Sequence, residues 1–235
     1  MNRTIGLGTA AAGIALAGAI GMWTGARLAG GAGDAALGDK VRTYILTHPE
    51  VLTEAAERAR IQPYRKAIET PFASAWAGNP KADVTLVMFT DYNCPFCRVT
   101  APAIEQLLAS DPRLKVVWRE MPVLGPQSDS AAAAALAAAL AGRYLPFHHA
   151  LFAGGRPDEV GIAAAAKAAG LAPEGVAAGA KSPEVQAQIV ANLSLARQIG
   201  IQATPFFVIG NRTFEGAIGY DGLAAAVAEA RRNRG

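Results

Sequence analysis

The sequence predicts an α/β protein in which a small sheet is joined to a block of alanine-rich helices. Three observations predict it: an apolar strand pattern at 84–90 that leads directly into a helix, a second strand at 114–118 after that helix, and a pair of short strands near the C-terminus. A strand, a crossover helix and a second strand form the unit of parallel pairing. The predicted order is therefore strand, helix, strand, helical block, hairpin and helix.

The composition indicates one packed domain with attachments. The chain has 235 residues, of which 51% are hydrophobic and 17% are charged, so it can bury a full-sized core. Two cysteines are too few for a disulfide-stapled scaffold or for a zinc site built from thiolates alone. The net charge of +3 owes much to Arg231, Arg232 and Arg234 at the C-terminal tip. Because nothing resembles a groove that neutralises many phosphates, we expect no nucleic-acid partner.

The N-terminus is predicted to be an addressing segment, a signal anchor or signal peptide at 1–29. No charged residue occurs from Thr4 to Ala26, a stretch long enough to cross a bilayer. The stretch exceeds the apolar core of a typical signal peptide, which favours a retained anchor over a cleaved signal. The Gly- and Ala-rich segment 30–38 then predicts a flexible linker. The rest of the chain is expected in an oxidising compartment outside the cytoplasm.

Residues 39–69 predict two or three short helices, interrupted at His48-Pro49 and again at Pro63. Eight apolar positions recur there at helical spacing: Val41, Ile45, Leu46, Val51, Leu52, Ala55, Ala56 and Ala59. Such a stripe needs a cover, which is either the main domain or an identical neighbouring chain. The charged residues between them are interpreted as the solvated face of the segment: Glu54, Glu57, Arg58 and Arg60.

The first strand, VTLVMFT at 84–90, is rich in β-branched and aromatic residues and leads into Asn93-Cys94-Pro95-Phe96-Cys97. Proline at the second position of the Cys-Pro-Phe-Cys sequence suits the first turn of a helix, which we expect to contain Pro102 and to end at Asp111-Pro112. LKVVW at 114–118 predicts the second strand.

A helical insertion is predicted at about 128–200. Alanine, the strongest helix former, dominates this stretch, and Ser182 before Pro183 predicts a helix N-cap.

The C-terminal part returns to sheet. Strands at 206–209 and 213–215, joined by Gly210-Asn211-Arg212, predict a β-hairpin. Asp221 is then expected to cap a last helix.

Cys94 and Cys97 are separated by two residues at the predicted start of a helix. Such a pair is a thiol–disulfide centre, half of a metal site, or a structural disulfide. Placement favours the first, because the free N–H groups and the macrodipole at a helix N-terminus stabilise an anion. Cys94 is therefore predicted to be the nucleophilic thiolate, and Cys97, one turn further in, the resolving thiol.

Three motifs carry a family resemblance: DYNCPFC at 91–97, ATPFFVIG at 203–210 and FEG at 214–216. Together they resemble the DsbA branch of the thioredoxin superfamily, over roughly 82–235. The long separation between Cys97 and Pro205 fits a thioredoxin fold that carries the helical insertion of DsbA-like proteins. The segment 41–52 is similar to the N-terminal extension of ScsC-type proteins, where it is an oligomerisation element.

The resemblance implies an α/β thioredoxin fold with an inserted helical domain. It also implies a cis peptide bond before Pro205, which places the Thr204 backbone beside the cysteine pair to receive a substrate. Threonine at this position is more typical of isomerase and ScsC-like branches than of the dedicated oxidase. Tyr92 and Phe96 flank the cysteines and either form an apolar rim for unfolded substrates or pack against the fold.

One position departs from the family pattern. Members commonly carry a buried glutamate six residues before the first cysteine, which handles the proton of the resolving thiol, and here that position is Met88. Glu120 and Asp91 are the nearest acidic candidates for this proton transfer. The pair His148-His149 has no third ligand at metal spacing, so we interpret it as packed or solvent-exposed and predict no metal site.

The expected activity is that of a periplasmic protein disulfide oxidoreductase without a diffusible cofactor, on the periplasmic side of the inner membrane or released from it. Its expected partners are unfolded or misfolded exported proteins and a membrane redox partner, and the direction of electron transfer stays open. Segment 39–69 is expected to mediate self-association, which would favour isomerase or reductase work. One alternative is a periplasmic copper-handling protein that binds Cu(I) through the same thiols. Another is a structural module that holds partners through its N-terminal helices.

Overall fold

The computed structural model describes residues 34–233, and the contacts within it divide the chain into one unit that ends at Thr53 and another that begins at Glu54. The predicted signal anchor or signal peptide at 1–29 lies outside the described residues, as does the first part of the predicted linker. Within the described range, no helix combines the length and the hydropathy needed to cross a bilayer.

In the described part of the N-terminal unit, residues 34–47 are helical. The described end of the segment predicted as a flexible linker therefore belongs to a helix, because Asp34 is followed by the strong helix formers Ala35, Ala36 and Leu37. It ends before Pro49, as the sequence predicts. Five large apolar side chains of this unit are exposed: Leu37, Val41, Tyr44, Leu46 and Leu52.

The second unit is built on a five-stranded sheet in the order β1-β3-β2-β4-β5. Its strands are β1 (Trp76–Gly78), β2 (Val84–Thr90), β3 (Leu114–Glu120), β4 (Phe206–Ile209) and β5 (Arg212–Glu215). β2 and β3 pair in parallel, as predicted, and the other pairs are antiparallel. β1 was not predicted, because three residues are too few to show alternation. β3 runs past its predicted end at Trp118, which brings Glu120 into the sheet.

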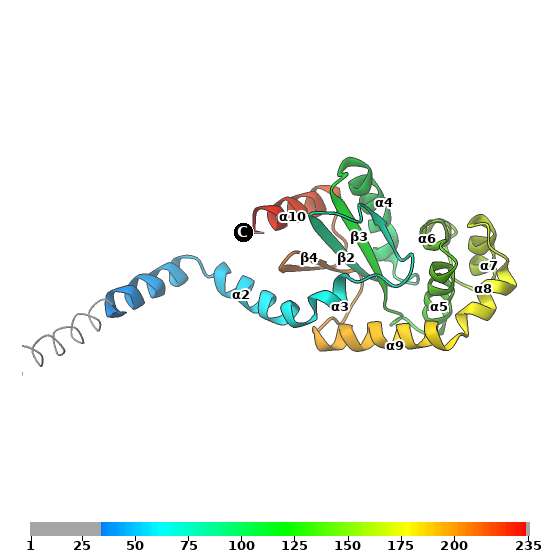
Figure 1. Ribbon diagram of the computed structural model, residues 1–235, viewed down its shortest axis with the longest axis horizontal. Helices are drawn as coiled ribbons and strands as arrows, with labels where there is room; N and C mark the ends of the chain where they lie inside the picture. The colour runs from blue at the N-terminus through cyan, green and yellow to red at the C-terminus, as the bar shows by residue number, and fades with distance from the viewer. Residues whose placement is uncertain (1–33, 234–235) are drawn as a thin grey trace, which may run out of the picture. The chain divides into compact units, whose positions relative to one another are not determined.

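Seven helices come after β2 in the described part of the chain. One lies between β2 and β3, five lie between β3 and β4, and one follows β5: α4 (Pro95–Ser110), α5 (Pro126–Leu140), α6 (Tyr144–Ala153), α7 (Glu159–Ala168), α8 (Pro173–Ala180), α9 (Pro183–Gln198) and α10 (Tyr220–Arg232). The predicted insertion at 128–200 is confirmed as the helices α5 to α9, and α9 leads back from this block toward the sheet (Figure 1). The Ser182 hydroxyl caps α9 by accepting a bond from Val185 N–H at 3.4 Å. The cap predicted at Asp221 is wrong, because the N-cap of α10 is Gly219, two positions earlier, and Asp221 lies in the first turn of the helix.

Small side chains let the inserted helices approach one another closely. α5 buries a run of alanines from Ala131 to Ala139. Gly179 of α8 lies over this run, where an added Cβ would stand only 3.1 Å from the Ala137 Cβ. The alanine content therefore serves tight helix packing as well as helix propensity.

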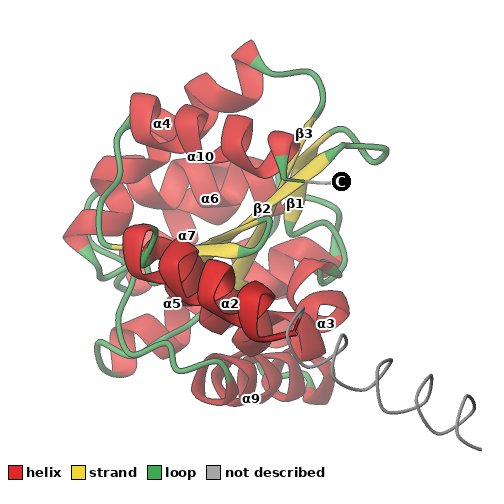
Figure 2. Ribbon diagram, turned by 90° about the vertical axis from the view of Figure 1, so that its left-hand side faces the viewer, coloured by secondary structure: helices red, strands yellow, loops and turns green. Residues whose placement is uncertain are grey.

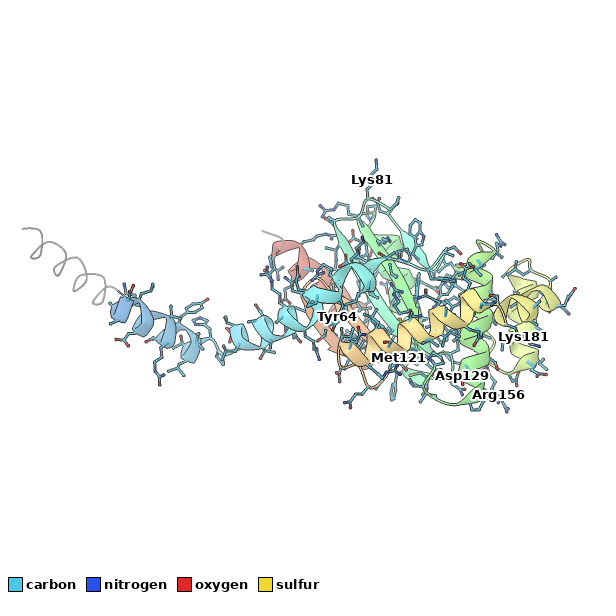
Figure 3. The ribbon with its side chains drawn as sticks, turned by 60° about the horizontal axis from the view of Figure 1, so that its bottom comes forward. Tyr64, Lys81, Met121, Asp129, Arg156 and Lys181 are labelled. Carbon is cyan, nitrogen blue, oxygen red and sulfur yellow. The ribbon has the colours of Figure 1, made fainter. Side chains whose placement is uncertain are left out.

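The sheet has two faces with separate cores. Alternate residues of β2 point to opposite sides, so Leu86 and Met88 enter one core and Val87 and Phe89 the other. The first face, which we call the α4 face, lies under α4 and α10 and continues into the inserted helices; the second, the α3 face, lies against α3 and α9 (Figure 2). Figure 3 marks the α3 side by Tyr64 and Met121, which both belong to that second core.

The segment before the sheet consists of α2 (Glu50–Ile61), a 3-10 turn η1 (Gln62–Tyr64) and α3 (Arg65–Glu69), with breaks near His48-Pro49 and Pro63 as predicted. Ile61 and Ile68 are fully buried against the sheet. Arg119 of β3 donates to the Ile68 carbonyl at 3.2 Å and to the carbonyls of Ala67 and Thr70 at the end of α3. Burial lowers the pKa of Arg119 to about 10, so the guanidinium stays charged at neutral pH and complements the helix C-terminus.

A second anchor joins α2 to the hairpin. Arg212 of β5 pairs with Glu57 at 2.8 Å, with Glu54 at 3.3 Å and with Glu229 of α10 at 3.0 Å. Arg60 also donates to the Thr213 hydroxyl at 2.9 Å. The interpretation of this charged face as merely solvated is therefore wrong, because most of its charges have partners on β5. The predicted segment 39–69 is divided: its later part is covered by the chain's own domain, and its earlier part belongs to the other unit.

Candidate functional site

The two cysteines lie at the junction between the loop after β2 and the first turn of α4, both with free thiols. Cys94 is the N-cap residue of α4, with an extended backbone (φ −80°, ψ 115°), and Pro95 occupies the first helical position. Its Sγ lies 3.2 Å from the Thr204 carbonyl oxygen, and its side chain retains 3% of its surface exposure. The sequence-based placement of Cys94 at a helix N-terminus is confirmed, and this is where a thiolate gains most from the helix.

Cys97 lies in the first turn of α4 and is fully buried. Burial raises the pKa of the Cys97 thiol to about 12, and the charge of Cys94 adds to the rise. A backbone hydrogen bond from Asp91 and the hydroxyls of Thr204 and Thr90 act in the opposite direction on this pKa. At neutral pH Cys97 is therefore a thiol, which has to lose a proton before it can attack another sulfur.

The Thr204-Pro205 peptide bond is cis, as the family resemblance implies. The Thr204 carbonyl accepts from the Cys94 thiol, and the Thr204 side chain lowers the pKa of Cys97 against the effect of burial. Pro205 is also tied to the hairpin, since its carbonyl accepts from Gly216 N–H at 2.9 Å.

The two aromatic residues that flank the cysteines have different environments. Phe96 is 60% exposed, whereas Tyr92 is buried. Tyr92 was predicted as a possible part of a substrate-binding rim, and this is wrong, because its ring packs on Phe152 and its hydroxyl bonds to His148 Nδ1 at 2.8 Å. Three further apolar side chains are exposed on α4 and on the loop after β3: Val99, Val123 and Leu124. We call these three and Phe96 the apolar patch.

Asp91 is a brace for the loops around the site. One carboxylate oxygen accepts from Asn93 N–H at 2.8 Å, and the other accepts from Val123 N–H at 2.9 Å and Leu124 N–H at 3.1 Å. These three bonds hold the Asp91 side chain in one position between the two loops. Its part in proton transfer stays a prediction.

Glu120, the other candidate, is fully buried on the α4 face. Its Oε1 accepts from the Tyr144 hydroxyl at 2.6 Å and from the Tyr92 hydroxyl at 3.3 Å. Burial raises the pKa of Glu120 to about 8, with the Asp91 charge adding to the rise and the two tyrosine bonds opposing it. A carboxyl group in this state can hold or release a proton near neutral pH.

His148 belongs to the same cluster, and His149 does not. His148 is buried among Tyr92, Trp118 and Tyr144, and burial lowers its pKa to about 3, so the ring is neutral. His149 is partly exposed, with Nε2 3.2 Å from Glu105. Across residues 34–233, no group of three or more His, Cys, Asp or Glu side chains is arranged to hold a metal ion.

Two members of the site were missed from the sequence, Thr90 and Tyr144. His148 was interpreted as packed or exposed, and it is packed, but its place beside Glu120 was not predicted. Thr90 ends a strand whose other residues, apart from Thr85, are apolar, and its position next to the cysteine loop is the signal that could have singled it out. Tyr144 and His148 are four residues apart on α6, a spacing that places both on one helix face, but nothing in the sequence shows what that face meets.

A strand, a Cys-x-x-Cys pair at a helix N-terminus and a cis-proline loop beside it define a thioredoxin-like thiol site. The model of the DSBA-like thioredoxin domain family matches residues 85–228, more than half of the chain. The protein belongs to this family.

Solved structures show the same relationship. A thioredoxin-like oxidoreductase from Silicibacter pomeroyi is 40% identical and covers 67% of this chain and 91% of its own, with a TM-score of 0.64. The catalytic domain of Proteus mirabilis ScsC is 29% identical, with coverages of 75% and 99% and a TM-score of 0.68. A periplasmic thioredoxin-like protein from Salmonella enterica is 30% identical, with coverages of 72% and 96% and a TM-score of 0.63. These likenesses support thiol–disulfide exchange as the general kind of activity.

Curated relatives include a protein named Na(+)/H(+) antiporter NhaA 3 from Salinispora tropica, which is 28% identical over 158 residues. The match covers 65% of this chain and 24% of that protein. The chain thus spans about a quarter of the length of the curated relatives it matches first.

Proposed function

We propose that this protein is a periplasmic protein disulfide oxidoreductase that works through Cys94 and Cys97. The observation that carries the proposal is the difference between the two sulfurs. Cys94 lies at the N-terminus of a helix, whose free N–H groups favour an anion, while Cys97 is buried and hard to ionise. An attacking thiol gains from a site that stabilises its thiolate, and a resolving thiol gains from being shielded until the first bond has formed.

The exchange takes place in two steps. In the reducing direction, the Cys94 thiolate bonds to one sulfur of a client disulfide, and the other client sulfur leaves as a thiolate that takes up a proton. Cys97 then loses its proton and attacks Cys94. The bond between Cys94 and the client breaks, so the protein is oxidised and the client holds two thiols. Oxidation of a client follows the same steps in reverse, and neither direction requires a diffusible cofactor.

The clients are unfolded or misfolded exported proteins, and the apolar patch is the surface that would receive them. Phe96 and Val99 project from the helix that Cys94 caps, and Leu124 is linked to the cysteine loop through a bond of 3.5 Å from the Asn93 amide to its carbonyl. An unfolded chain offers apolar side chains that a folded protein buries, so such a patch favours it over a folded protein. The Thr204 backbone offers polar contacts beside the sulfurs.

Self-association is proposed to set the direction of transfer. The exposed apolar residues of the N-terminal unit, Leu37, Val41 and Tyr44, are spaced by four and three residues on one helix face. If copies of the chain cover one another there, several active sites share one client at high effective concentration, which favours isomerase or reductase work. A monomer would instead be reoxidised readily by a membrane redox partner.

Light scattering tests this assembly. The chain from Asp34 should form an oligomer, and the chain from Glu54 should be a monomer with higher oxidase activity. A monomer in both cases would remove self-association from the proposal and leave the thiol chemistry intact.

The periplasmic location is proposed from the likeness to a periplasmic thioredoxin-like protein and from the chemistry of a lone, redox-active cysteine pair. Tethering through residues 1–29 would hold the domain at the inner membrane, next to a membrane redox partner. Fractionation of cells that express the full chain tests this, since a tethered protein stays with the membrane pellet after osmotic shock.

The activity itself is tested by a reduction potential measured against glutathione, together with refolding of a protein with scrambled disulfides. The wild type should equilibrate with glutathione and restore activity to the scrambled protein, and Cys94→Ser should do neither. Full activity in Cys94→Ser would overturn the proposed function.

A further inference from the structure

Two buried oxygen atoms beside the cysteines have no hydrogen-bond partner among the described residues. One is Oε2 of Glu120, whose other oxygen is occupied by Tyr144 and Tyr92. The other is the hydroxyl oxygen of Thr90, which makes no bond of normal geometry. A buried polar atom without a partner costs about 1–3 kcal/mol, so such atoms are rare in folded proteins unless they have a use.

The two atoms come from neighbouring positions on one face of the sheet. Thr90 and Glu120 are partners in the parallel register of β2 and β3, at the carboxyl ends of both strands. The preceding pairs on this side, Leu86 with Val116 and Met88 with Trp118, all enter the core of the α4 face. Because alternate side chains of a strand share a face, Thr90 and Glu120 point into that same core, on strands about 4.8 Å apart.

Cys97 enters this core from α4 and is also fully buried. The Thr90 side chain lowers the pKa of that thiol, against the larger effect of burial. Thr90 is thus the register partner of Glu120, and it points into the core that Cys97 enters from α4. A hydroxyl can accept one proton while it donates another, and it can thus connect a thiol and a carboxylate that do not touch.

We propose that Glu120 exchanges the proton of Cys97 through the Thr90 hydroxyl during disulfide closure. The inference rests on the proposed function. In the closing step, Cys97 gives its proton to Thr90 while Thr90 gives its own proton to the Glu120 carboxylate. The Cys97 thiolate then bonds to Cys94, and the bond between Cys94 and the client breaks. The client sulfur leaves as a thiolate, and Glu120 is left protonated. In the opening direction, Glu120 returns the proton.

The charges around Glu120 support this assignment. From the loop after β2, Asp91 faces it as a carboxylate that three backbone N–H groups hold fixed. From α6, Tyr144 donates to it, and His148 stays neutral because burial depresses its pKa. Tyr92 also donates, and burial raises its pKa well above 10, so it keeps its proton.

Arg119 precedes Glu120 on β3 but bonds to α3 on the opposite face of the sheet. In the described core of the α4 face, Glu120 thus has a carboxylate oxygen, Oε2, that is available to take a proton.

The pKa of Cys97 also changes at the step where the proposed transfer occurs. Part of the rise in the pKa of Cys97 comes from the charge on Cys94. That charge is absent once Cys94 has bonded to a client, so Cys97 becomes easier to deprotonate at the moment when it has to attack. Glu120, with a pKa of about 8, is then suited to take the proton near neutral pH.

The test separates the two steps of the exchange. The reduced full chain is mixed with glutathione disulfide in a rapid-quench apparatus at several pH values. The first step, formation of the mixed disulfide at Cys94, and the second, release of glutathione by Cys97, are followed by mass spectrometry. Four variants are compared with the wild type: Glu120→Gln, Thr90→Val, Thr90→Ser and Ser128→Ala. The last is the matched control, since Ser128 also buries a hydroxyl that lacks a partner among the described residues.

We expect the wild-type rate of the second step to level off near pH 8. Glu120→Gln and Thr90→Val should lose this inflection and slow the second step by about a hundredfold at pH 7, the lower end of the usual contribution of general acid–base catalysis. Thr90→Ser should restore most of the rate, and Ser128→Ala should retain the wild-type profile. The first step should change less than about twofold in all variants, which shows that they fold.

An unchanged second step in folded Thr90→Val and Glu120→Gln would overturn the proton path while leaving the proposed function in place. If Glu120→Gln does not fold, Thr90→Val alone decides, because it removes only a hydroxyl. A wild type that forms no mixed disulfide at all would contradict the proposed function itself.

Discussion

The two faces of the sheet differ in how completely their buried polar side chains are hydrogen-bonded. On the α3 face, Arg119 is surrounded by acceptors: the carbonyls of Ala67, Ile68 and Thr70 and the side chain of Asn192. On the α4 face, Thr90 and Glu120 each retain an oxygen without a partner in the described structure. The fully bonded group fastens one helix to the sheet, whereas the incompletely bonded groups lie next to the reactive sulfurs. Unmet hydrogen-bonding capacity, rather than burial of polar groups as such, therefore marks the reactive side.

The largest expected effect is a loss of stability when Arg119, on the α3 face, is replaced. Arg119→Met should lower the free energy of unfolding by about 3 kcal/mol, because several carbonyls at the end of α3 lose their donor together. Denaturant titration measures this. The rate of glutathione exchange per folded molecule should stay at the wild-type value, and a selective loss of exchange would break the division between the two faces.

The second effect is the pH dependence of stability. Folding raises the pKa of Glu120 to about 8 from an unfolded value near 4.3, so the folded state binds more protons between these limits. The resulting stability is present below about pH 4 and is lost as pH rises toward 8, by up to about 1.4 kcal/mol per pH unit. Glu120→Gln should flatten this loss in thermal unfolding between pH 5 and 8. An equal slope in the variant would show that another group causes it.

His148, on the same face of the sheet, changes stability with pH in the direction opposite to Glu120. Its pKa falls from about 6.5 to about 3 on folding, so the unfolded state binds more protons in this interval. Stability from this group is present above about pH 6.5 and is lost as pH falls toward 3. Acid unfolding of the wild type should therefore begin below pH 6, and His148→Gln should weaken that dependence.

The smallest effect concerns the partly exposed anchor of α2. Arg212→Ala should cost about 1 kcal/mol, because the arginine is 32% exposed and bonds to three carboxylates rather than one. Arg113→Ala is the matched control, since Arg113 is 66% exposed and should cost less than about 0.5 kcal/mol. Equal costs for the two would mean that the Glu54 and Glu57 contacts add nothing to holding α2.

Local signals in the sequence predicted much of this arrangement. The run at 84–90 has the bounds of β2, and the Cys-Pro-Phe-Cys sequence begins α4, because strand pattern and proline placement act over a few residues. The pairing of Thr90 with Glu120 was beyond reach, since it depends on the register between two strands and on the extension of β3 past Trp118. Tyr92 likewise could be assigned to the core only once α6 was placed over it.

The N-terminal segment shows the same limit. Its apolar stripe was recognised, but periodicity states only that a helix face needs a cover. The contacts show which side chains of the segment are covered. Ile61 and Ile68 pack on the sheet, and Leu37 and Val41 stay exposed in the described structure.

Trapping of the mixed disulfide distinguishes an attacking Cys94 from a resolving Cys97. An unfolded client that carries one disulfide is mixed with reduced Cys97→Ser and, separately, with reduced Cys94→Ser, and covalent adducts are counted by non-reducing electrophoresis and peptide mapping. We expect a stable adduct through Cys94 in Cys97→Ser, and little adduct in Cys94→Ser because Cys97 is buried and protonated. Equal trapping by the two variants, or an adduct mapped to Cys97, would contradict it.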